Sequence, residues 1–247
     1  MAKQTGLGDN FFIAGYNLSG DVGSVDAISS PMGVLEATAI NKSAVERLPG
    51  LRDGMVEFST YFNPTALQEH AALKTLPRTD TVVTYARGTT IGNPSAAMVG
   101  KQIDYAPSRG DDGSLVFKVS AQANGFGLDW GRQVTAGVRS DTTATNGAAL
   151  DLGTGTLSFG LQAYLQVFSF TGTSVTIKLQ GSSDNGADAY ADITGGAFTT
   201  VTARTSERIQ TSRTLAVERF IRVVTTGTFS QCSFAVMVNR NTAAVSY

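Results

Sequence analysis

One histidine and one cysteine limit the chemistry that this chain can support. His70 follows Glu69 inside a segment of helical character, where a solvated or packed histidine is more common than a general base. A Ser-His-Asp triad would have to use His70, and no nucleophile-elbow sequence accompanies it. Zinc sites that need two or more histidine or cysteine ligands are excluded. Cys232 alternates with apolar residues, so we expect a small buried side chain rather than a reactive thiol.

Carboxylates are the remaining groups that could bind a metal ion. Asp184, Asp188 and Asp192 share a segment that invites comparison with an oxygen-ligand calcium loop. The segment lacks the spacing and the bidentate glutamate of such a loop, so a solvated turn is the better interpretation. Asp111 and Asp112 are adjacent and point to different faces, so they do not form a glycosidase pair. We therefore expect no enzyme activity, no metal site and no cofactor.

The composition indicates a β-rich chain, and its low charge is compatible with surface buried in contacts between subunits without showing such contacts. Charged residues make up 16% of the 247 residues, against roughly 25% in typical soluble proteins, and there are 27 glycines. This mixture is typical of short twisted strands joined by tight turns. The net charge of −1 excludes strong phosphate-driven binding of nucleic acid by the monomer. The length allows one large domain or two moderate ones.

The start of the chain and its cysteine content bear on where the protein assembles. A single cysteine permits no intrachain disulfide, and no signal-peptide pattern follows Met1. The longest apolar runs are far too short to span a membrane. We therefore expect assembly inside a cell and no association with a membrane.

The clearest strand pattern covers residues 55–62. A polar loop with a Pro-Gly break precedes it, and Asn63-Pro64 ends it. Alternation predicts that one face carries Val56, Phe58, Thr60 and Phe62. The opposite face would carry Met55, Glu57, Ser59 and Tyr61.

Residues 65–76 form the one convincing helix pattern. Thr65 is a plausible N-cap, and Gln68 stands three residues later, as in a capping box. The apolar stripe would consist of Leu67, Ala71 and Leu76. Pro77 would stop the helix.

The rest of the chain divides into two units of β pattern. Composition changes after Trp130, which predicts domains at 1–132 and 133–247, the first with an N-terminal arm at about 1–9 and a long projecting loop at about 29–54. Strands expected in the second unit are 157–170, 174–182, 198–203, 207–211, 218–225 and 231–239. The predicted fold is all-β with one short helix, a sandwich or barrel followed by a second β-sandwich.

Several segments of the first half together resemble the major tail proteins, or tail-tube proteins, of long non-contractile-tailed phages, particularly siphophages of actinobacteria. These segments are Leu18–Val22, Glu46–Asn63, Leu76–Asp80, Gly92–Tyr105 and Arg109–Asn124. The second half looks like the β-sandwich domains that decorate many such subunits. The resemblance implies a structural virion protein in which six copies form a ring, sheets join into an inner barrel, and rings stack into a tube that conducts DNA.

The resemblance also implies partners, a location and residues that act in assembly. Candidate residues of the ring or stacking interface are Phe11, Phe12, Glu46, Arg47, Arg52 and Asp53, and candidate lumen residues are Glu57 and Gln122. The partners would be further copies and other tail proteins (tape measure, tail terminator and distal tail protein), with non-specific passage of genomic DNA. The protein would reside in the virion tail after assembly in the host bacterial cytoplasm.

The sequence also leaves two other functions possible. The first is a different virion decoration or tail subunit, which would not polymerise along an axis. The second is a carbohydrate-binding β-sandwich, in which Trp130, Tyr164 and Tyr190 could stack on sugars. Glycan binding by the second half would separate it from a structural role.

Overall fold

The computed structural model describes residues 5–76 and 79–245, which are nearly all β with one short helix, as the sequence predicts. Pro77, the expected end of the helix, lies outside the described residues. The elements of the first half are β1 (Asn10–Ile13), β2 (Tyr16–Asn17), β3 (Val22–Ser29), β4 (Met32–Glu36), β5 (Arg47–Arg52), β6 (Met55–Tyr61), α1 (Glu69–Leu73), β7 (Thr81–Ala86), β8 (Pro94–Arg109) and β9 (Leu115–Ala123). Those that follow are β10 (Asp129–Gln133), β11 (Arg139–Asp141), β12 (Thr145–Asn146), β13 (Leu150–Asp151), β14 (Leu161–Ser182), β15 (Ala191–Ala197), β16 (Thr205–Gln210) and β17 (Phe220–Arg240).

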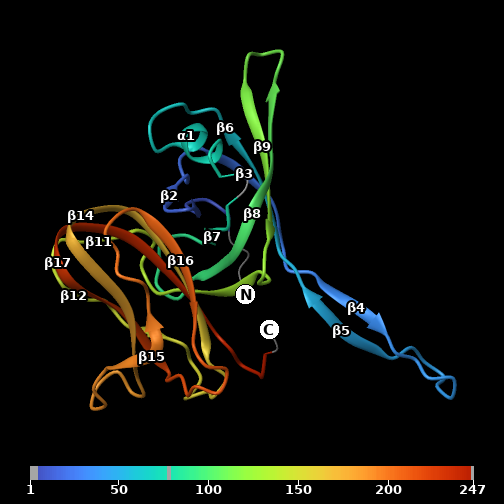
Figure 1. The fold of residues 1–247 in the computed structure, drawn as a ribbon, viewed down its shortest axis with the longest axis vertical. Coiled ribbons are helices and arrows are strands. Elements are labelled where there is room, and N and C mark those ends of the chain that lie inside the picture. The colour runs from blue at the N-terminus through green and yellow to red at the C-terminus, as the bar shows by residue number, and fades with distance from the viewer. Residues whose placement is uncertain (1–4, 77–78, 246–247) are drawn as a thin grey trace.

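The first half is an antiparallel sheet in the order β2–β1–β7–β8–β9–β6–β3. Strand β6 shows the predicted alternation, because Val56, Phe58 and Thr60 are buried. Phe62 lies beyond the end of β6 and is exposed, with its ring stacked on Phe117. Helix α1 lies on the apolar face of β6 and β9 (Figure 1). The core of this half therefore lies between the sheet and the helix.

The helix is shorter than the sequence predicts. It begins at Glu69, and Leu67 before it has a positive φ of 69° and an exposed side chain. Thr65 does not cap it; instead Asp21 accepts a hydrogen bond from the backbone N–H of Glu69 at 3.0 Å. A cap supplied by Asp21, in the turn that precedes β3, sets the helix start, which the local sequence of the helix could not indicate. As a result the buried residues of α1 are Glu69, Ala72 and Leu73, and Leu76 is buried just beyond its end.

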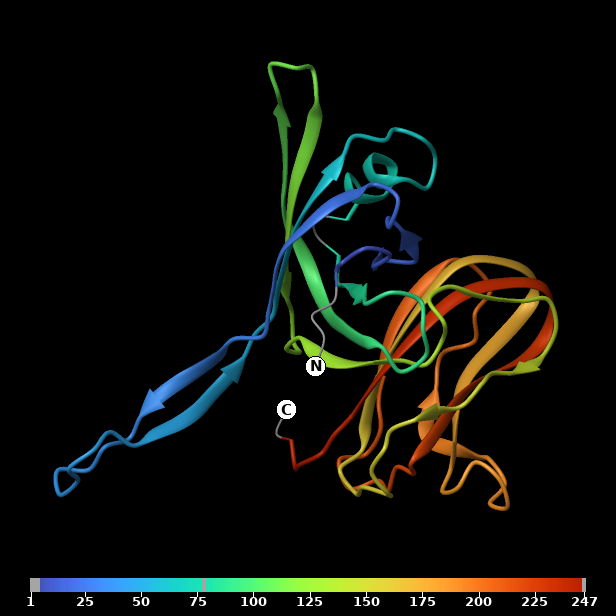
Figure 2. The same cartoon turned by 180° about the vertical axis from the view of Figure 1, so that it is seen from behind.

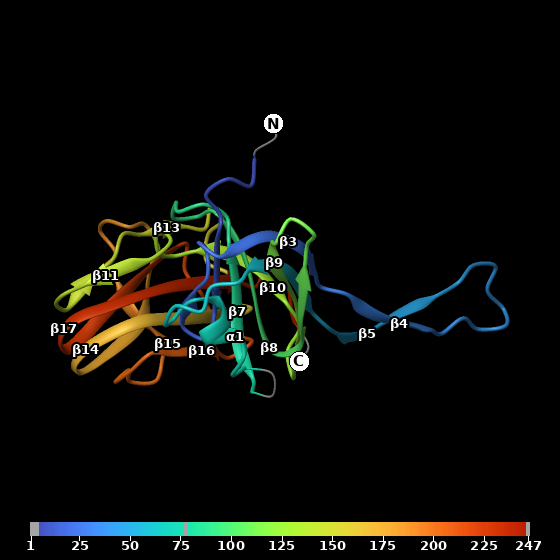
Figure 3. The same cartoon turned by 90° about the horizontal axis from the view of Figure 1, so that it is seen from above.

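The expected long loop forms a β-hairpin, which residues 30–31 link to β3 and residues 53–54 link to β6. Strands β4 and β5 pair only with each other, as a two-stranded antiparallel sheet separate from the main one. The hairpin, called the arm below (Met32–Arg52), extends far from the rest of the chain (Figures 1 and 2). Seen from above, it points away from the second half (Figure 3). The predicted projection is therefore present, but as paired strands.

The second half is organised by two very long strands. Strands β14 and β17 pair antiparallel from Leu161↔Arg240 to Ser182↔Phe220, although the sequence pattern had divided each into two. Gly172 (φ 150°) and Gly227 (φ 130°) lie at the bend, where the register shifts. Glycine is needed there, because a Cβ on Gly172 would come within 2.4 Å of the Cα of Phe229. The pairing of β14 with β17 therefore continues past Gly172, where the sequence predicts a break between two strands.

The shorter strands of the second half depart further from the pattern. The expected strand 198–203 makes one bridge, between Val201 and Val175. Strand β15 was not predicted, because Gly195, Gly196 and Asp192 lower its apparent β propensity.

Two separate hydrophobic cores meet near residue 130. The core of the first half includes Leu128, and that of the second half includes Val134. Strand β10 runs between them and pairs with both β8 and β17, so one sheet passes through both halves. Gly131 permits the close approach, because a Cβ there would lie 2.1 Å from the carbonyl oxygen of Val238. The division at residue 132 stays a prediction.

Candidate assembly surface

Four strands of the first half form a sheet with free outer edges. Their order is β3–β6–β9–β8, and β3 pairs only with β6. The first part of β8 pairs with β7 up to Gly100, and Lys101–Arg109 pairs only with β9. The outer backbone groups of β3 and of Lys101–Arg109 therefore have no strand partner within the described chain. Free edges of this kind are templates for pairing with another chain.

The two candidate lumen residues lie on the same face of this four-stranded sheet. Glu57 is opposite Ser120, and Gln122 is opposite Met55, two residues away on β6. The face points away from α1 and the core, because the alternate residues of β6 are the buried ones. Its charged side chains are Asp26, Glu57, Lys101, Asp104 and Lys118. Opposite signs nearly balance, so the face is polar and close to neutral.

The arm exposes large apolar side chains along its whole length. Their exposed fractions are Met32 50%, Val34 63%, Leu35 59%, Ile40 107%, Val45 49%, Leu48 55% and Leu51 89%. Exposed apolar groups scattered singly are normal, but a contiguous set marks a contact surface. An isolated two-stranded hairpin is also only marginally stable in water. The arm is therefore a candidate contact surface.

The base of the arm is fastened to both halves of the chain. Arg52 donates hydrogen bonds to the backbone oxygen of Leu128 at 3.1 Å and to the buried carboxylate of Asp129 at 2.8 Å. Asp129 also accepts from the hydroxyl of Tyr164 at 2.6 Å, and Tyr164 accepts from Arg208 at 3.2 Å. Burial, followed by the charge of Asp129, raises the pKa of Tyr164. The ion pair thus joins β5 to β10, β14 and β16.

A hollow of about 230 Å³ lies beside this anchor. The residues that line it are Gly50, Leu51, Arg52, Gly125, Phe126, Gly127, Asp129 and Arg208. The guanidinium of Arg208 stands 3.8 Å from the centre of the Phe126 ring. The hollow is therefore mainly apolar with fixed charges at its margin.

The predicted interface residues fall into three groups. Glu46 and Arg47 are exposed on the arm, with Glu46 paired to Lys42 at 2.9 Å. Arg52 makes the intrachain contacts described above, and Asp53 accepts from the backbone of Gly54 at 2.7 Å.

Phe11 and Phe12 lie in the interior and leave almost no surface for a neighbour. They are 2% and 1% exposed. The ring of Phe11 lies 4.4 Å from that of Phe58, and the ring of Phe12 lies 4.9 Å from that of Phe168. We therefore drop both from the proposed interface. Strand β1 is an inner strand between β2 and β7, which the sequence of the segment alone could not show.

Comparison with known proteins gives only distant similarity. No family model matches the chain, and no curated protein matches it. Among solved structures, the chain is similar to the Dit protein of phage SPP1, described as a paradigm of the hub adsorption apparatus in phages that infect Gram-positive bacteria (10% identity over 94% of this chain and 99% of that chain, TM-score 0.33). It is also similar to chains of the phage p2 baseplate in its activated conformation with Sr (8% identity, 94% and 98% covered, TM-score 0.36) and with Ca (11% identity, 94% and 98% covered, TM-score 0.30). These scores carry no functional argument, so the function proposed below rests on the chain's own surfaces and on the sequence resemblance of its first half.

A buried polar cluster surrounds the single histidine. Glu69 is fully buried, which raises the pKa of its carboxyl group. The hydroxyl of Tyr105 donates to Glu69 at 2.7 Å and lies 2.8 Å from Nδ1 of His70. Burial and the neighbouring Glu69 in turn raise the pKa of Tyr105. The cluster fastens α1 to β8.

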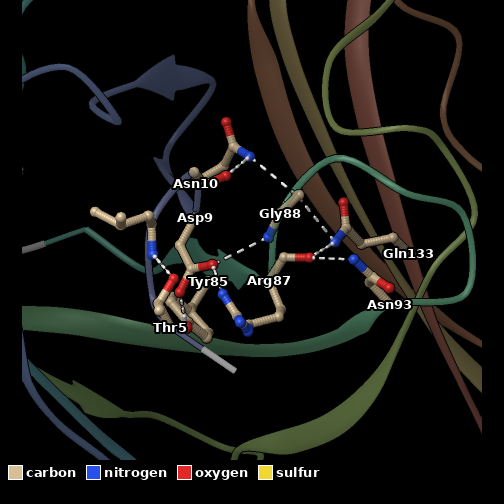
Figure 4. A network of polar contacts seen from close by, with 10 residues as sticks. Thr5, Asp9, Asn10, Tyr85, Arg87, Gly88, Asn93 and Gln133 are labelled. Carbon is tan, nitrogen blue, oxygen red and sulfur yellow. Dashed lines mark hydrogen bonds and ion pairs between the residues drawn. The ribbon is translucent and has the colours of Figure 1, made fainter. Parts of the chain in front are cut away.

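The residues that precede β1 are also bonded to the end of β7 and to the residues just after it (Figure 4). Asp9 accepts hydrogen bonds from the guanidinium of Arg87 at 2.6 Å, from the backbone of Gly88 at 3.1 Å, and from the hydroxyl of Tyr85. Burial, followed by the bond to Asp9, raises the pKa of Tyr85 to about 12. The N-terminal segment that the sequence predicts to project, about residues 1–9, therefore ends before Asp9, because Asp9 is bonded to the residues at the end of β7.

The three aspartates that suggested a metal loop have separate partners. Asp184 accepts from the backbone of Gly186 and of Asp188, at 2.8 and 3.0 Å. Asp192 pairs with Lys178 at 2.7 Å. Across residues 5–76 and 79–245, no group of three His, Cys, Asp or Glu is placed to hold a metal ion. Nor does the same part of the chain contain a helix long and apolar enough to cross a membrane.

Proposed function

We propose that the chain is a structural protein of a phage tail, whose copies join edge to edge into a ring and whose rings stack into the tail tube. The observation that supports this best is a four-stranded sheet that has a free edge on each side. The exposed apolar arm supports assembly independently. The identification with a phage tail comes from the resemblance of the first half to tail-tube proteins.

The two free edges are complementary under rotation about a ring axis. Neighbouring strands of the sheet alternate in direction, so β3 and β8 run in opposite senses. Rotation keeps the direction of each strand relative to the axis, so β8 of one copy meets β3 of the next in antiparallel orientation. The edges also match in length, because β3 has 8 residues and the free part of β8 is Lys101–Arg109. Closing the ring would pair both free edges of the four-stranded sheet.

The size of such a ring is compatible with passage of DNA. Six copies of four strands, spaced about 4.8 Å apart, give a circumference of roughly 115 Å and a diameter of about 37 Å before strand tilt widens it. The face of Glu57 and Gln122 would point inward, because α1 and the core occupy the other face. Its nearly balanced charges would hold few phosphates, so DNA could slide without tight binding.

Electron microscopy of the purified protein across a range of concentrations tests this proposal, with light scattering alongside. Long hollow tubes are the expected result, and a map that resolves strands should show β3 of one copy paired with Lys101–Arg109 of the next. Single rings that never stack would favour a hub role over a tube. A chain that stays monomeric at every concentration, also with preformed tail tips added as initiators, refutes the proposal.

No observation favours a sugar-binding platform in place of assembly. Tyr164 is 1% exposed. The ring of Tyr190 lies 4.1 Å from the guanidinium carbon of Arg222, which covers it. Trp130 is half exposed but stands on β10, apart from both tyrosines in sequence and in strand. The flat aromatic surface that sugars require is therefore not formed by these residues.

A further inference from the structure

The link between the arm and β6 holds a side-chain carboxyl group against the next backbone amide. Oδ1 of Asp53 accepts a hydrogen bond from the backbone N–H of Gly54 at 2.7 Å, and Oδ2 accepts from Nε2 of Gln122 at 3.1 Å. A nitrogen bonded in this way to Oδ1 lies about 3–3.5 Å from Cγ, which is a near-attack separation. Glycine carries no side chain that would shield its nitrogen. The amide of Gly54 is therefore placed to react with the carboxyl group of Asp53.

From this geometry we propose that Asp53 isomerises spontaneously to isoaspartate through a cyclic imide formed with Gly54. The nitrogen of Gly54 forms a bond to Cγ of the neutral carboxylic acid, and the amide proton and the carboxyl hydroxyl leave as one molecule of water. Water then opens the five-membered imide at the former backbone carbonyl of Asp53, so that the chain continues through Cγ. The two steps release and consume one water molecule, and no oxidant or reductant takes part.

Two features of the site favour the cyclisation step. Negative charge develops on a carboxyl oxygen as the nitrogen adds to Cγ, and the amide N–H of Gln122 already donates to Oδ2, where it would stabilise that charge. The N–H of Gly54 is used by the carboxylate, and Gly54 precedes β6, which begins at Met55. Cyclisation therefore need not break a hydrogen bond between strands.

The second Asp-Gly pair of the chain lacks this geometry. In the turn between β8 and β9, Oδ1 of Asp112 accepts from the backbone N–H of Ser114 at 2.9 Å, and the N–H of Gly113 donates to the carbonyl oxygen of Gly110 at 3.0 Å. The bond from Ser114 also lowers the pKa of the Asp112 carboxyl group, which leaves less of the neutral acid. Both aspartates are followed by glycine, so the difference between them is set by the fold.

Isomerisation would change the base of the arm. The main chain gains one atom between Arg52 and Gly54, and the former carbonyl group of Asp53 becomes a free carboxylate. That carbonyl oxygen accepts from the backbone N–H of Leu128 at 3.4 Å, and the N–H of Asp53 donates to Pro31 at 2.9 Å. A longer link between these two bonds would alter the direction in which the arm leaves the body. The reaction needs only the single chain, so it does not depend on the proposed ring.

Incubation of the wild-type chain, folded and in urea, tests the proposal. The protein is kept at about pH 5 and about 37 °C, where an ordinary carboxyl group is partly protonated, and isoaspartate at each site is quantified by electron-transfer dissociation mass spectrometry of digested peptides. Asp53 should isomerise about tenfold faster than Asp112 in the folded chain, and the two rates should converge in urea, where both sets of contacts are lost. Equal rates in the folded chain, or the same ratio of rates in urea, overturn the proposal.

A nucleophile and one substitution test the route. Hydroxylamine added during the incubation should trap the imide as a hydroxamic acid at position 53, and isoaspartate that forms without this adduct overturns the cyclic route. Gln122→Met removes the N–H at Oδ2 and should slow isomerisation at Asp53 about threefold, with Asp112 of the same chain as the internal reference. Gln231→Met, at an exposed position of β17, should leave both rates unchanged. Equal rates at Asp53 in the two variants overturn the role given to Gln122.

Discussion

Arg47 and Arg52 lie on the same strand of the arm, yet they should respond very differently to the same change. Arg47 is exposed on β5, whereas Arg52 pairs at 2.8 Å with Asp129, whose side chain is 3% exposed. Replacing Arg52 with glutamate would place a second carboxylate beside Asp129 and leave the first without its cation. Replacing Arg47 with glutamate changes only a solvated charge. We therefore expect Arg52→Glu to destabilise the monomer and Arg47→Glu to leave it intact.

The size of the difference follows from the burial of the pair. Removing one partner of a buried ion pair costs about 3–5 kcal/mol. The side chain of Arg52 is 30% exposed, so solvent screening places the loss near the lower end, at about 3 kcal/mol. A surface change such as Arg47→Glu should stay within about 0.5 kcal/mol. With a urea slope of about 3 kcal/mol per molar, the Arg52 variant should unfold at a midpoint about 1 M lower.

Equilibrium unfolding in urea, followed by tryptophan fluorescence at low protein concentration, measures both midpoints without interference from assembly. A midpoint for Arg52→Glu equal to that of the wild type would refute the reasoning, because it would show that the Arg52–Asp129 pair contributes no net stability. A loss in Arg47→Glu as large as in Arg52→Glu would refute it as well, since it would mean that the arm is not free in the monomer.

Three further predictions test the interior. Burial raises the pKa of Glu69, so the folded state holds the carboxyl proton more tightly than the unfolded state, and the free energy of unfolding falls as pH rises above the ordinary carboxyl pKa. Glu69→Gln should flatten this fall, which urea midpoints taken between about pH 4 and about pH 7 would measure. A pH profile unchanged by the substitution would contradict the assignment. Gly131→Ala should cost about 2–3 kcal/mol through overpacking against Val238, whereas Gly155→Ala, with nothing within 4 Å of the added Cβ, should be nearly neutral in the same unfolding assay. Burial raises the pKa of Cys232 to about 12, so a thiol reagent should label it only after unfolding in guanidinium, and rapid labelling of the native chain would show that the strand opens.

Patterns that repeat along one strand were predictable from the sequence. The alternation of Val56, Phe58 and Thr60 placed the buried face of β6 correctly, and with it the polar face of Glu57. The all-β class followed from the same kind of pattern. These predictions succeeded because each depends on neighbours within a few residues.

Features set by distant contacts were not predictable. The helix start depends on Asp21, which is 48 residues from Glu69 in the chain. The sequence predicts a break between two strands at Gly172, but the paired strands β14 and β17 bend at this residue and stay paired beyond it. Arg52 reads as an exposed loop residue, but its partner Asp129 comes from the strand that joins the two halves. In each case tertiary contacts override the local pattern.

The position of β17 in the chain has a consequence for the order of folding during synthesis. This strand is the partner of β10, β11, β12, β13 and β14, and it follows all of them. At about 5–20 residues per second, a ribosome needs roughly 4–16 seconds to pass from the start of β14 to the end of β17. Throughout that interval the apolar side chains of β14 lack β17, the strand that pairs with β14 along its whole length, although the strands of the first half have already been synthesised. The free edges of β3 and of Lys101–Arg109 are therefore complete before the second half can close, so the proposed pairing between copies is open to neighbouring nascent chains that are still unfinished.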